Sequence, residues 1–466
     1  MHISSVRMVD FRLFKQAKLS LHPKLCVFLG DNGQGKTTIL DALSMLVSRI
    51  FPYCVYRPAM TALQYATTDR RMQEVTVRKK RLMRSSEESG IACVLEMGRM
   101  EDTGESAKFL LTAGKKIPYD TDALIYTARD LGMRLDEMAF QNGEGIPVFV
   151  HYGPHRGAMQ GERKRFGRRK YNYQNPFAAY VNALRPSLDF EAFLEWFSNE
   201  EYAELRERKH DEGYESRELK VVRDALSSVF SGMHIKLSDP RFERNPKSFT
   251  MTQTLPSGEK LDIAFDQLSD GYRGISALVV DFAMRLAIAN QASDINPLMG
   301  EGVLIIDEID VHLHPKWQYR ILEDLQRTFP NVQIIVTTHS AQVVSMVKKE
   351  SVYILSAEEG VLNECHPENQ TQGNYPSDIE AEIMDTPEAY REQDAFRSYL
   401  ACLATLQEDA AESDRFAAAF DKLKNHYGDM HPLTQEVEAK LRGVRARNAM
   451  LAKFKGKQCR YEEDKD

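Results

Sequence analysis

The sequence predicts an α/β fold in which buried parallel strands are flanked by helices. Residues 24–30 form an apolar run that ends in a glycine-rich turn, and apolar side chains then recur at helical spacing up to residue 51. Two later runs, "GVLIIDE" at 302–308 and "VQIIVTTH" at 332–339, are apolar throughout and end in polar residues, as buried parallel strands do. A long amphipathic helix is predicted over 271–290.

The other elements follow from periodicity and turn residues. Strands are expected at 2–9 and 146–152, short strands on either side of the "PSG" turn at 256–258, and a helix over 316–329. Residues 176–228 are expected to be helical, with "NPFAAYVNAL" and "SLDFEAFLEWFSNEEYAELRERKHDE" as candidate helices. They lack sustained heptads, which favours a compact lobe over a coiled coil. Three C-terminal helices are expected at 386–408, 411–427 and 432–455.

The composition is that of an ordinary globular protein. The chain has 466 residues, of which 42% are hydrophobic and 28% charged. It contains no apolar run long enough to span a bilayer and no signal-peptide pattern, so a cytoplasmic location is expected. The net charge of −7 argues against nucleic-acid binding over the whole surface but allows a local basic groove. Six scattered cysteines favour reduced thiols over a zinc site or a disulfide framework.

The turn after the first buried run carries a phosphate-binding pattern. Its sequence "GDNGQGKTT" comprises Gly30, Asp31, Asn32, Gly33, Gln34, Gly35, Lys36, Thr37 and Thr38. The spacing of two glycines, a lysine and a threonine matches a P-loop, whose backbone N–H groups surround phosphate oxygens. We expect Lys36 to reach the β- and γ-phosphates and Thr37 to bind Mg²⁺. A chance glycine turn is the alternative, but the position between a strand and a helix favours the P-loop.

Two acidic residues end the strand predicted at 302–308. Asp307 and Glu308 are delivered to the carboxyl edge of the sheet, where α/β proteins bind ligands. We expect Asp307 to hold Mg²⁺ and Glu308 to polarise a water aimed at the γ-phosphate. His339 ends the neighbouring run and is expected to hydrogen-bond the γ-phosphate. The alternatives are a solvated acidic turn and a structural histidine.

A second candidate phosphate-binding surface lies in "LSDGYR", at the start of the long helix. Ser269, Asp270 and Gly271 sit where the helix dipole is positive. One chain then carries two such surfaces for what we expect to be one nucleotide. The simplest explanation is that these three residues cap a nucleotide held by a second copy of the chain.

The motifs together resemble those of ABC-type ATPases. The corresponding segments are Gly30–Thr37 for Walker A, Leu268–Arg273 for the signature "LSGGQ", Asp307–Glu308 for Walker B, 310–315 ("DVHLHP") for the D-loop and His339 for the switch histidine. The opening "DFRLF", the long gap between Walker A and the signature, and "DEIDVHLHPKWQ" are similar to the SMC and RecF-like branch. Within it, the chain resembles the AAA ATPases of bacterial defence islands, such as the PtuA ATPase of Septu and related retron systems.

The sequence departs from this pattern at two motif positions. Asp270 replaces the first signature glycine, which weakens capping unless its side chain caps the helix instead. Gln34 stands where serine is common. The Q-loop glutamine stays open between Gln141 and Gln160, which flank the relevant strand.

The resemblance implies a P-loop NTPase with an ABC-type ATPase head, ATP and Mg²⁺ as cofactors, and hydrolysis to ADP and phosphate. It also implies a homodimer through ATP-sandwiched heads, or a higher homo-oligomer, that controls a separately encoded HNH nuclease in anti-phage defence. The alternatives are a RecF-like ATP-dependent DNA-binding protein in repair or recombination, and a transporter motor, against which the long gap argues. The expected regions are 1–155 (Walker A and a β-rich subdomain), 156–262 (basic loop and helical insertion), 263–360 (signature, Walker B, D-loop and switch histidine) and 361–466 (helical partner-docking region).

Two basic stretches and one histidine pair fall outside these motifs. Residues 156–173 hold seven basic residues, one acid and two tyrosines, which suits either nucleic-acid contact or a solvated loop. Residues 70–84 form a second basic stretch with the same alternatives. "HYGDMH" at 426–431 is expected to join two helices rather than to bind a metal.

Overall fold

The structure is a computed structural model of the chain. It describes residues 1–56, 62–77, 80–99, 106–115, 125–156, 172–233, 236–244, 247–362, 365–384, 394–407 and 414–463. The chain divides into two compact units, Met1–Met384 and Asp385–Asp466, and each is described by itself. Among the described residues, no helix is both long and apolar enough to cross a membrane.

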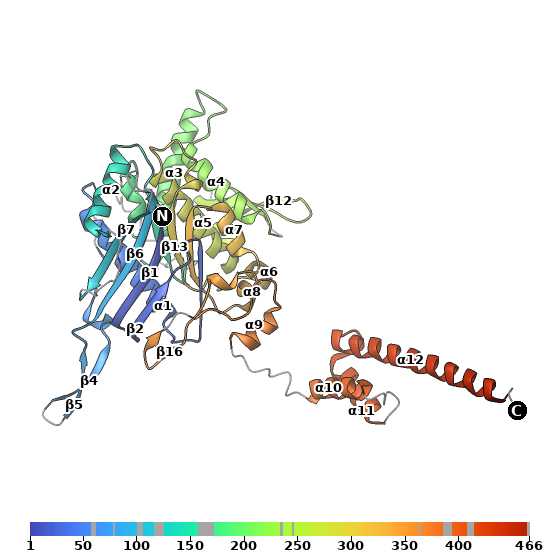
Figure 1. Cartoon of the computed structure of the whole chain (residues 1–466). Helices are drawn as coiled ribbons and strands as arrows, with labels where there is room; N and C mark the ends of the chain where they lie inside the picture. Colours follow the sequence, from blue (N-terminus) through green and yellow to red (C-terminus); the bar gives the residue numbers. More distant parts are fainter. Residues whose placement is uncertain are drawn as a thin grey trace. The chain divides into compact units, whose positions relative to one another are not determined.

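A five-stranded parallel sheet forms the centre of the first unit (Figure 1). Its order is β15 (Val352–Ile354), β3 (Leu25–Leu29), β14 (Val332–Thr337), β13 (Gly302–Ile306) and β9 (Val148–Tyr152). The side chains of the middle strands are buried on both faces, which explains their continuous apolar sequences. The predicted strands near 24–30, 146–152, 302–308 and 332–339 are confirmed. Because the strands are parallel, the segments that follow β3, β13 and β14 emerge at one edge.

A second, seven-stranded and mostly antiparallel sheet completes the α/β architecture. Its order is β16 (Ala357–Glu358), β17 (Val361–Leu362), β2 (Phe14–Ser20), β1 (His2–Phe11), β6 (Gly90–Arg99), β7 (Ser106–Gly114) and β8 (Ile125–Thr127). β1 confirms the strand predicted at 2–9. β2 is not among the predicted strands, because its buried positions Phe14, Ala17 and Leu19 do not alternate regularly. The pair β4 (Met72–Val77) and β5 (Lys80–Ser85) overlaps the basic stretch 70–84.

Helices α1 (Lys36–Val47) and α5 (Asp270–Ala289) both pack on β9. α1 also contacts β6 and β7 and therefore lies between the two sheets. α5 confirms the helix predicted at 271–290, but its last sixteen residues are buried on every face, so the amphipathic description is wrong. Its polar Asp281 accepts hydrogen bonds from Tyr152 (2.6 Å) and Arg285 (2.8 Å), which explains how charged residues are tolerated there.

The helical lobe consists of α3 (Phe190–Glu207), α4 (Arg217–Phe230) and a three-stranded sheet. The sheet contains β10 (Lys236–Arg244), β11 (Lys247–Thr254) and β12 (Lys260–Ala264), and the last two flank the predicted "PSG" turn. The lobe is compact, as expected, but "NPFAAYVNAL" is not an α-helix. Asn175 caps only a short 3₁₀ helix at Pro176–Tyr180, whose aromatic side chains are anchored in the core. Helix α2 (Ala128–Phe140) lies outside the elements that periodicity predicted.

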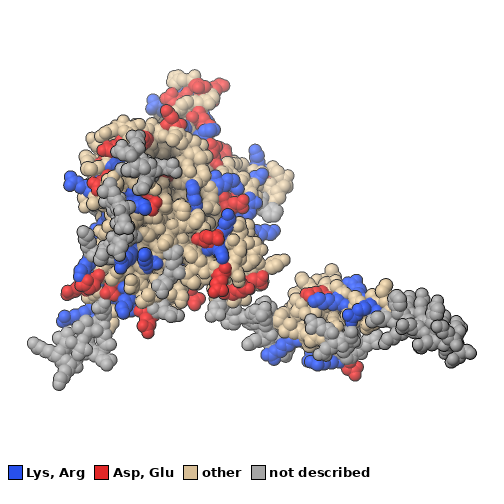
Figure 2. Space-filling view, viewed as in Figure 1, with Lys and Arg blue, Asp and Glu red and all other residues tan. Residues whose placement is uncertain are grey.

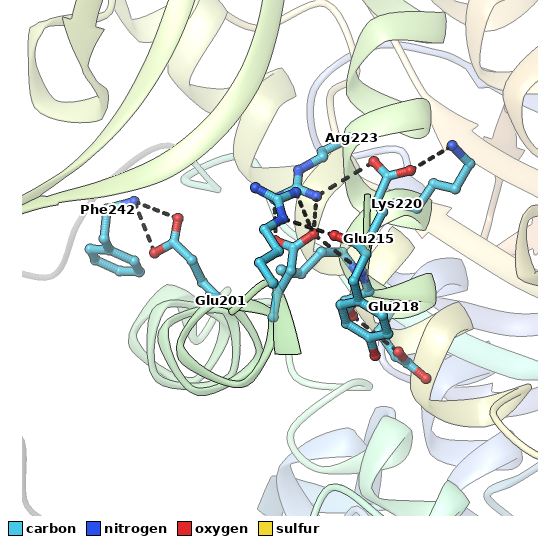
Figure 3. Close-up of polar contacts among 11 residues, drawn as sticks. Glu201, Glu215, Glu218, Lys220, Arg223 and Phe242 are labelled. Atoms are coloured by element: carbon cyan, nitrogen blue, oxygen red, sulfur yellow. Dashed lines mark hydrogen bonds and ion pairs between the residues drawn. The ribbon is translucent and has the colours of Figure 1, made fainter. Parts of the chain in front are cut away.

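Polar contacts around Arg223, which Figure 3 labels, tie the two lobe helices together through a buried carboxylate. Glu204 on α3 is 1% exposed and accepts hydrogen bonds from both Nη atoms of Arg223 on α4, at 2.9 and 2.8 Å. It also accepts from Arg208 (3.0 Å) and from the backbone N–H of Ser216 (3.1 Å). Nearby, the Glu201 carboxylate accepts a hydrogen bond from the backbone N–H of Phe242 on β10. This bond links α3 to the three-stranded sheet.

The contributions of Glu204 and Glu201 to folding stability change with pH in opposite directions. Burial alone would raise the pKa of Glu204, but the bonds from Arg223 and Ser216 outweigh it and lower the pKa. Its stabilising contribution is therefore present above the pKa of the unfolded chain and is lost as pH falls through the folded-state pKa. Burial raises the pKa of Glu201, so its contribution is present at low pH and is lost as pH rises.

We predict that Glu204→Ala lowers the free energy of unfolding by about 3 kcal/mol at neutral pH, because it leaves the Arg223 guanidinium without its buried partner. Chemical denaturation at pH 7 and at pH 4 checks this, and the difference from wild type should shrink at the lower pH. Glu207→Ala on the exposed end of the same helix is the control and should cost less than about 0.5 kcal/mol. Equal effects of the two variants would contradict the role of Glu204.

The helix predicted at 316–329 is interrupted. It forms α6 (Pro315–Gln318) and α7 (Ile321–Thr328), with Tyr319 and Arg320 between them. Further along, α8 (Ala341–Val344) and α9 (Pro376–Glu382) complete the first unit. Residues 361–384, expected in the C-terminal region, thus belong to the first unit, to which they contribute β17 and α9.

The second unit contains α10 (Asp394–Gln407), α11 (Asp414–Tyr427) and α12 (Pro432–Glu463) and confirms the three predicted C-terminal helices. They share a small core that includes Phe396, Tyr399, Cys402, Phe416, Leu423 and Val437. "HYGDMH" joins α11 to α12, as predicted. In the described part of the chain, no group of three or more His, Cys, Asp or Glu side chains is arranged to hold a metal.

Candidate nucleotide site

The glycine-rich loop connects β3 to α1 at the carboxyl edge of the parallel sheet. Gly35 is the N-cap of α1 and has a φ of 93°, in the left-handed region. A Cβ at this position would lie 2.4 Å from the Phe14 ring, so both the conformation and the packing require glycine. The loop therefore directs the amino end of α1, with its unpaired N–H groups, toward the sheet edge.

The Lys36 side chain is hydrogen-bonded to the backbone of this loop. Its Nζ donates to the carbonyl oxygens of Gly30 (2.6 Å) and Asp31 (3.0 Å). Burial lowers the pKa of Lys36, although the nearby Asp307 and Glu308 act to raise it. An incompletely hydrated ammonium among loop carbonyls is suited to an anionic ligand such as a phosphate.

Walker A and Walker B meet at a direct contact. Thr37 Oγ1 donates to Asp307 Oδ2 at 2.8 Å, although the two residues are 270 apart in sequence. Thr337 Oγ1 donates to Asp307 Oδ1 at 2.5 Å and fixes the carboxylate. A hydroxyl and a carboxylate oxygen side by side are ligands that Mg²⁺ prefers, so this pair fits the expected metal.

Glu308 follows in a strained backbone conformation. Its φ is 49°, in the left-handed region that non-glycine residues seldom adopt. Its N–H donates to Thr337 Oγ1 at 2.7 Å, and its side chain is half-buried. The turn after β13 is therefore anchored to β14 through the Thr337 side chain.

His339 emerges from the neighbouring strand with an exposed side chain. Its backbone N–H donates to Asp310 Oδ1 at 3.3 Å, and Thr338 Oγ1 donates to the same oxygen at 2.5 Å. The D-loop, which contains Asp310, is therefore linked to the segment that contains Thr338 and His339. Contact of the His339 ring with a phosphate stays a prediction.

The signature residues begin α5. Ser269 is the N-cap but makes no side-chain capping bond, and it is exposed together with Asp270. The Asp270 carboxylate pairs with Arg273 one turn along rather than capping the helix. A Cβ on Gly271 would lie 2.4 Å from the carbonyl oxygen of His312, so the signature glycine allows close packing on the D-loop of its own chain.

The remaining sequence candidates are less informative. Gln141 is the residue after α2 and precedes β9, so it lies toward the amino ends of the strands rather than at the phosphate loop. Gln160 and most of the basic stretch 156–173 lie outside the described residues, as do 78–79 of the other stretch.

Arg156 is the residue that sequence reasoning placed wrongly, since it was counted with the exposed basic loop. Its side chain is buried and donates to the carbonyl oxygens of Asp307 (2.9 Å), Glu308 (3.1 Å) and Ile309 (3.0 Å). The signal available in the sequence was its position four residues after a strand that ends at the same sheet edge.

Known proteins match the chain over both halves of this site. Residues 1–134 match the family described as "AAA ATPase domain", and residues 160–345 match "AAA domain, putative AbiEii toxin, Type IV TA system". The Retron Vc95 probable ATPase of Vibrio cholerae serotype O1 biovar El Tor is 26% identical over 83% of this chain and 79% of its own length.

Two other relatives match over shorter segments. The Retron Ec83 probable ATPase of Escherichia coli is 39% identical over 30% of this chain, and Septu protein PtuA of Bacillus mycoides (strain KBAB4) is 38% identical over 20%. These matches span 24% and 13% of the respective relatives.

Among solved structures, the SMC head domain from Thermotoga maritima aligns over 79% of this chain and 100% of its own, at 14% identity and a TM-score of 0.38. The fold assignment rests on the strand order and the phosphate loop of this chain rather than on that score. Both family matches and these relatives show that the chain is similar to AAA ATPases, including the ATPases of retron and Septu defence systems.

Proposed function

We propose that this chain binds Mg²⁺-ATP and hydrolyses it, and that an ATP-sandwiched head dimer controls a partner effector nuclease in anti-phage defence. The contact between Thr37 and Asp307 carries the first part of the proposal, because it joins the halves of the site in one chain. The relatives named for retron and Septu systems support the second part.

Each side chain of the site has a role in this proposal. Lys36 binds the β- and γ-phosphates, while Thr37 and Asp307 hold Mg²⁺, which neutralises phosphate charge when bound. Glu308 orients a water molecule and accepts its proton as that water approaches the γ-phosphate. His339 donates a hydrogen bond to the γ-phosphate and links its presence to the D-loop through Asp310.

The exposed amino end of α5 supports the dimer. Ser269 lies at the positive end of a 20-residue helix and makes no side-chain capping bond, so its hydroxyl can accompany the helix N–H groups toward a phosphate. Since Gly271 packs on His312, the signature and the D-loop move together in each protomer. We propose that both face the nucleotide of a second copy.

The charges at the tip of the lobe are mixed. Figure 2 shows acidic and basic side chains together over the tip of the α3–α4 hairpin, where Glu207 and Asp211 are exposed beside exposed Arg208 and Lys209. The basic stretch 156–173 carries the larger excess of positive charge and is the proposed nucleic-acid contact. The second unit is the proposed docking region for a separately encoded HNH nuclease.

A phage challenge tests the proposed function. Phage should form fewer plaques on cells that carry the wild-type gene with its natural flanking genes than on cells that carry the Lys36→Ala variant with the same flanking genes. Equal plaque counts, together with ATP turnover that rises on duplex DNA, would contradict the defence role and favour the RecF-like alternative.

A further inference from the structure

The Asp307–Ile309 turn has its backbone groups satisfied from three directions. Its N–H groups donate to Tyr152 on β9, to the Thr337 side chain and to the Thr337 carbonyl, at 2.8, 2.7 and 3.0 Å. Its three carbonyl oxygens all accept from the guanidinium of Arg156. The neighbouring strands thus fix one side of the turn. On the other side Arg156 binds all three carbonyls, and the Glu308 carbonyl also accepts from the Val311 N–H at 3.1 Å.

These hydrogen bonds hold Glu308 in a strained backbone conformation. Glu308 adopts a φ of 49°, in the left-handed region that is strained for a residue with a Cβ. Such a conformation persists only when its surroundings determine it. Without the guanidinium, the carbonyls of Asp307 and Ile309 would lose this donor, the Glu308 carbonyl would keep only the Val311 N–H, and the turn would be free to relax.

We propose that Arg156 is a positioning residue for ATP hydrolysis: it holds the Asp307–Ile309 turn so that the Glu308 carboxylate points at the attacking water. The inference rests on the proposed ATPase function. Arginine suits this role because its planar guanidinium presents five N–H donors in a fixed fork, whereas a lysine ammonium would reach fewer of the carbonyls. Burial lowers the pKa of Arg156 to about 10, which leaves the group charged at neutral pH.

The surroundings of Arg156 make a chemical rescue feasible. Its side chain lines a pocket of about 150 Å³ together with His155, Asp270, Arg273 and His312. Truncation to alanine would extend this pocket to the three carbonyls. A free guanidinium ion has the shape and charge of the missing group and can enter from the pocket.

The test compares wild type, Arg156→Ala and Arg156→Lys. We expect kcat of Arg156→Ala to fall about 100-fold, as for other misplaced catalytic groups, with the Kd for ATP little changed. Millimolar guanidinium should restore kcat about 10-fold, whereas equal concentrations of urea or KCl should not. If Arg156→Ala does not fold, Arg156→Lys takes its place in the test. It should show the same fall in kcat at constant KM. Arg223→Ala, which removes a half-buried arginine of the helical lobe away from the nucleotide site, should gain no kcat from guanidinium.

Hydrogen–deuterium exchange of the 307–311 amides provides a readout that does not depend on turnover. Faster exchange there in Arg156→Ala supports the proposal, and unchanged exchange overturns it. Normal kcat in Arg156→Ala overturns it as well, as does a parallel loss of ATP binding and kcat that guanidinium does not reverse. Absent turnover in wild type would instead contradict the proposed function, and the exchange experiment would still decide the role of Arg156.

Discussion

Glu308→Gln is expected to lower kcat for ATP hydrolysis by about 100-fold or more while ATP stays bound. The amide keeps the shape of the side chain and the strained backbone around it, but it cannot accept a proton from the attacking water. Asp307, Thr37 and Lys36 are unaltered, so the groups proposed to bind Mg²⁺-ATP remain. Phosphate release measures the first effect, and retention of labelled ATP during gel filtration measures the second.

Glu301→Gln is the matched control for this variant. Glu301 lies immediately before the amino end of β13, whereas Glu308 lies beyond the carboxyl end of the same strand. The Glu301 carboxylate pairs with the Met1 ammonium at 3.0 Å. Turnover should be unchanged in this control. Wild-type turnover in Glu308→Gln would contradict the role assigned to Glu308.

Lys36→Ala is expected to weaken ATP binding by about 100-fold or more, the equivalent of roughly 3 kcal/mol. It removes the cation at the loop mouth and its charge-assisted hydrogen bonds to phosphate. Titration with a fluorescent ATP analogue measures the Kd. Lys24→Ala, at the opposite end of β3, removes an exposed lysine that bonds to the Pro330 carbonyl and should leave the Kd unchanged. Equal affinity in Lys36→Ala and wild type would contradict a phosphate role for Lys36.

The central sheet and the meeting of Walker A with Walker B could be predicted from sequence for a physical reason. Strands buried on both faces must be continuously apolar, and parallel strands bring their carboxyl ends to one edge. Once 24–30 and 302–308 are recognised as such strands, proximity of Thr37 and Asp307 follows, and the 2.8 Å contact confirms it.

Other features depend on tertiary contacts that periodicity does not encode. Pro176–Tyr180 has helical composition, yet its aromatic side chains are drawn into the core and the helix stops after five residues. Arg156 belongs to a basic run in sequence, and only the fold shows that it turns inward to three carbonyls. The packing of Gly271 against His312 likewise joins segments that no local pattern connects.

The most direct test of the account is the molar mass of Glu308→Gln protein, measured by light scattering with and without ATP and Mg²⁺. We predict that ATP raises the mass to that of a dimer or a higher assembly, and that a Ser269→Arg substitution in the same protein prevents the rise. A mass that does not respond to ATP, or a rise that persists in the Ser269→Arg double variant, would contradict capping of the nucleotide by the signature of a second copy.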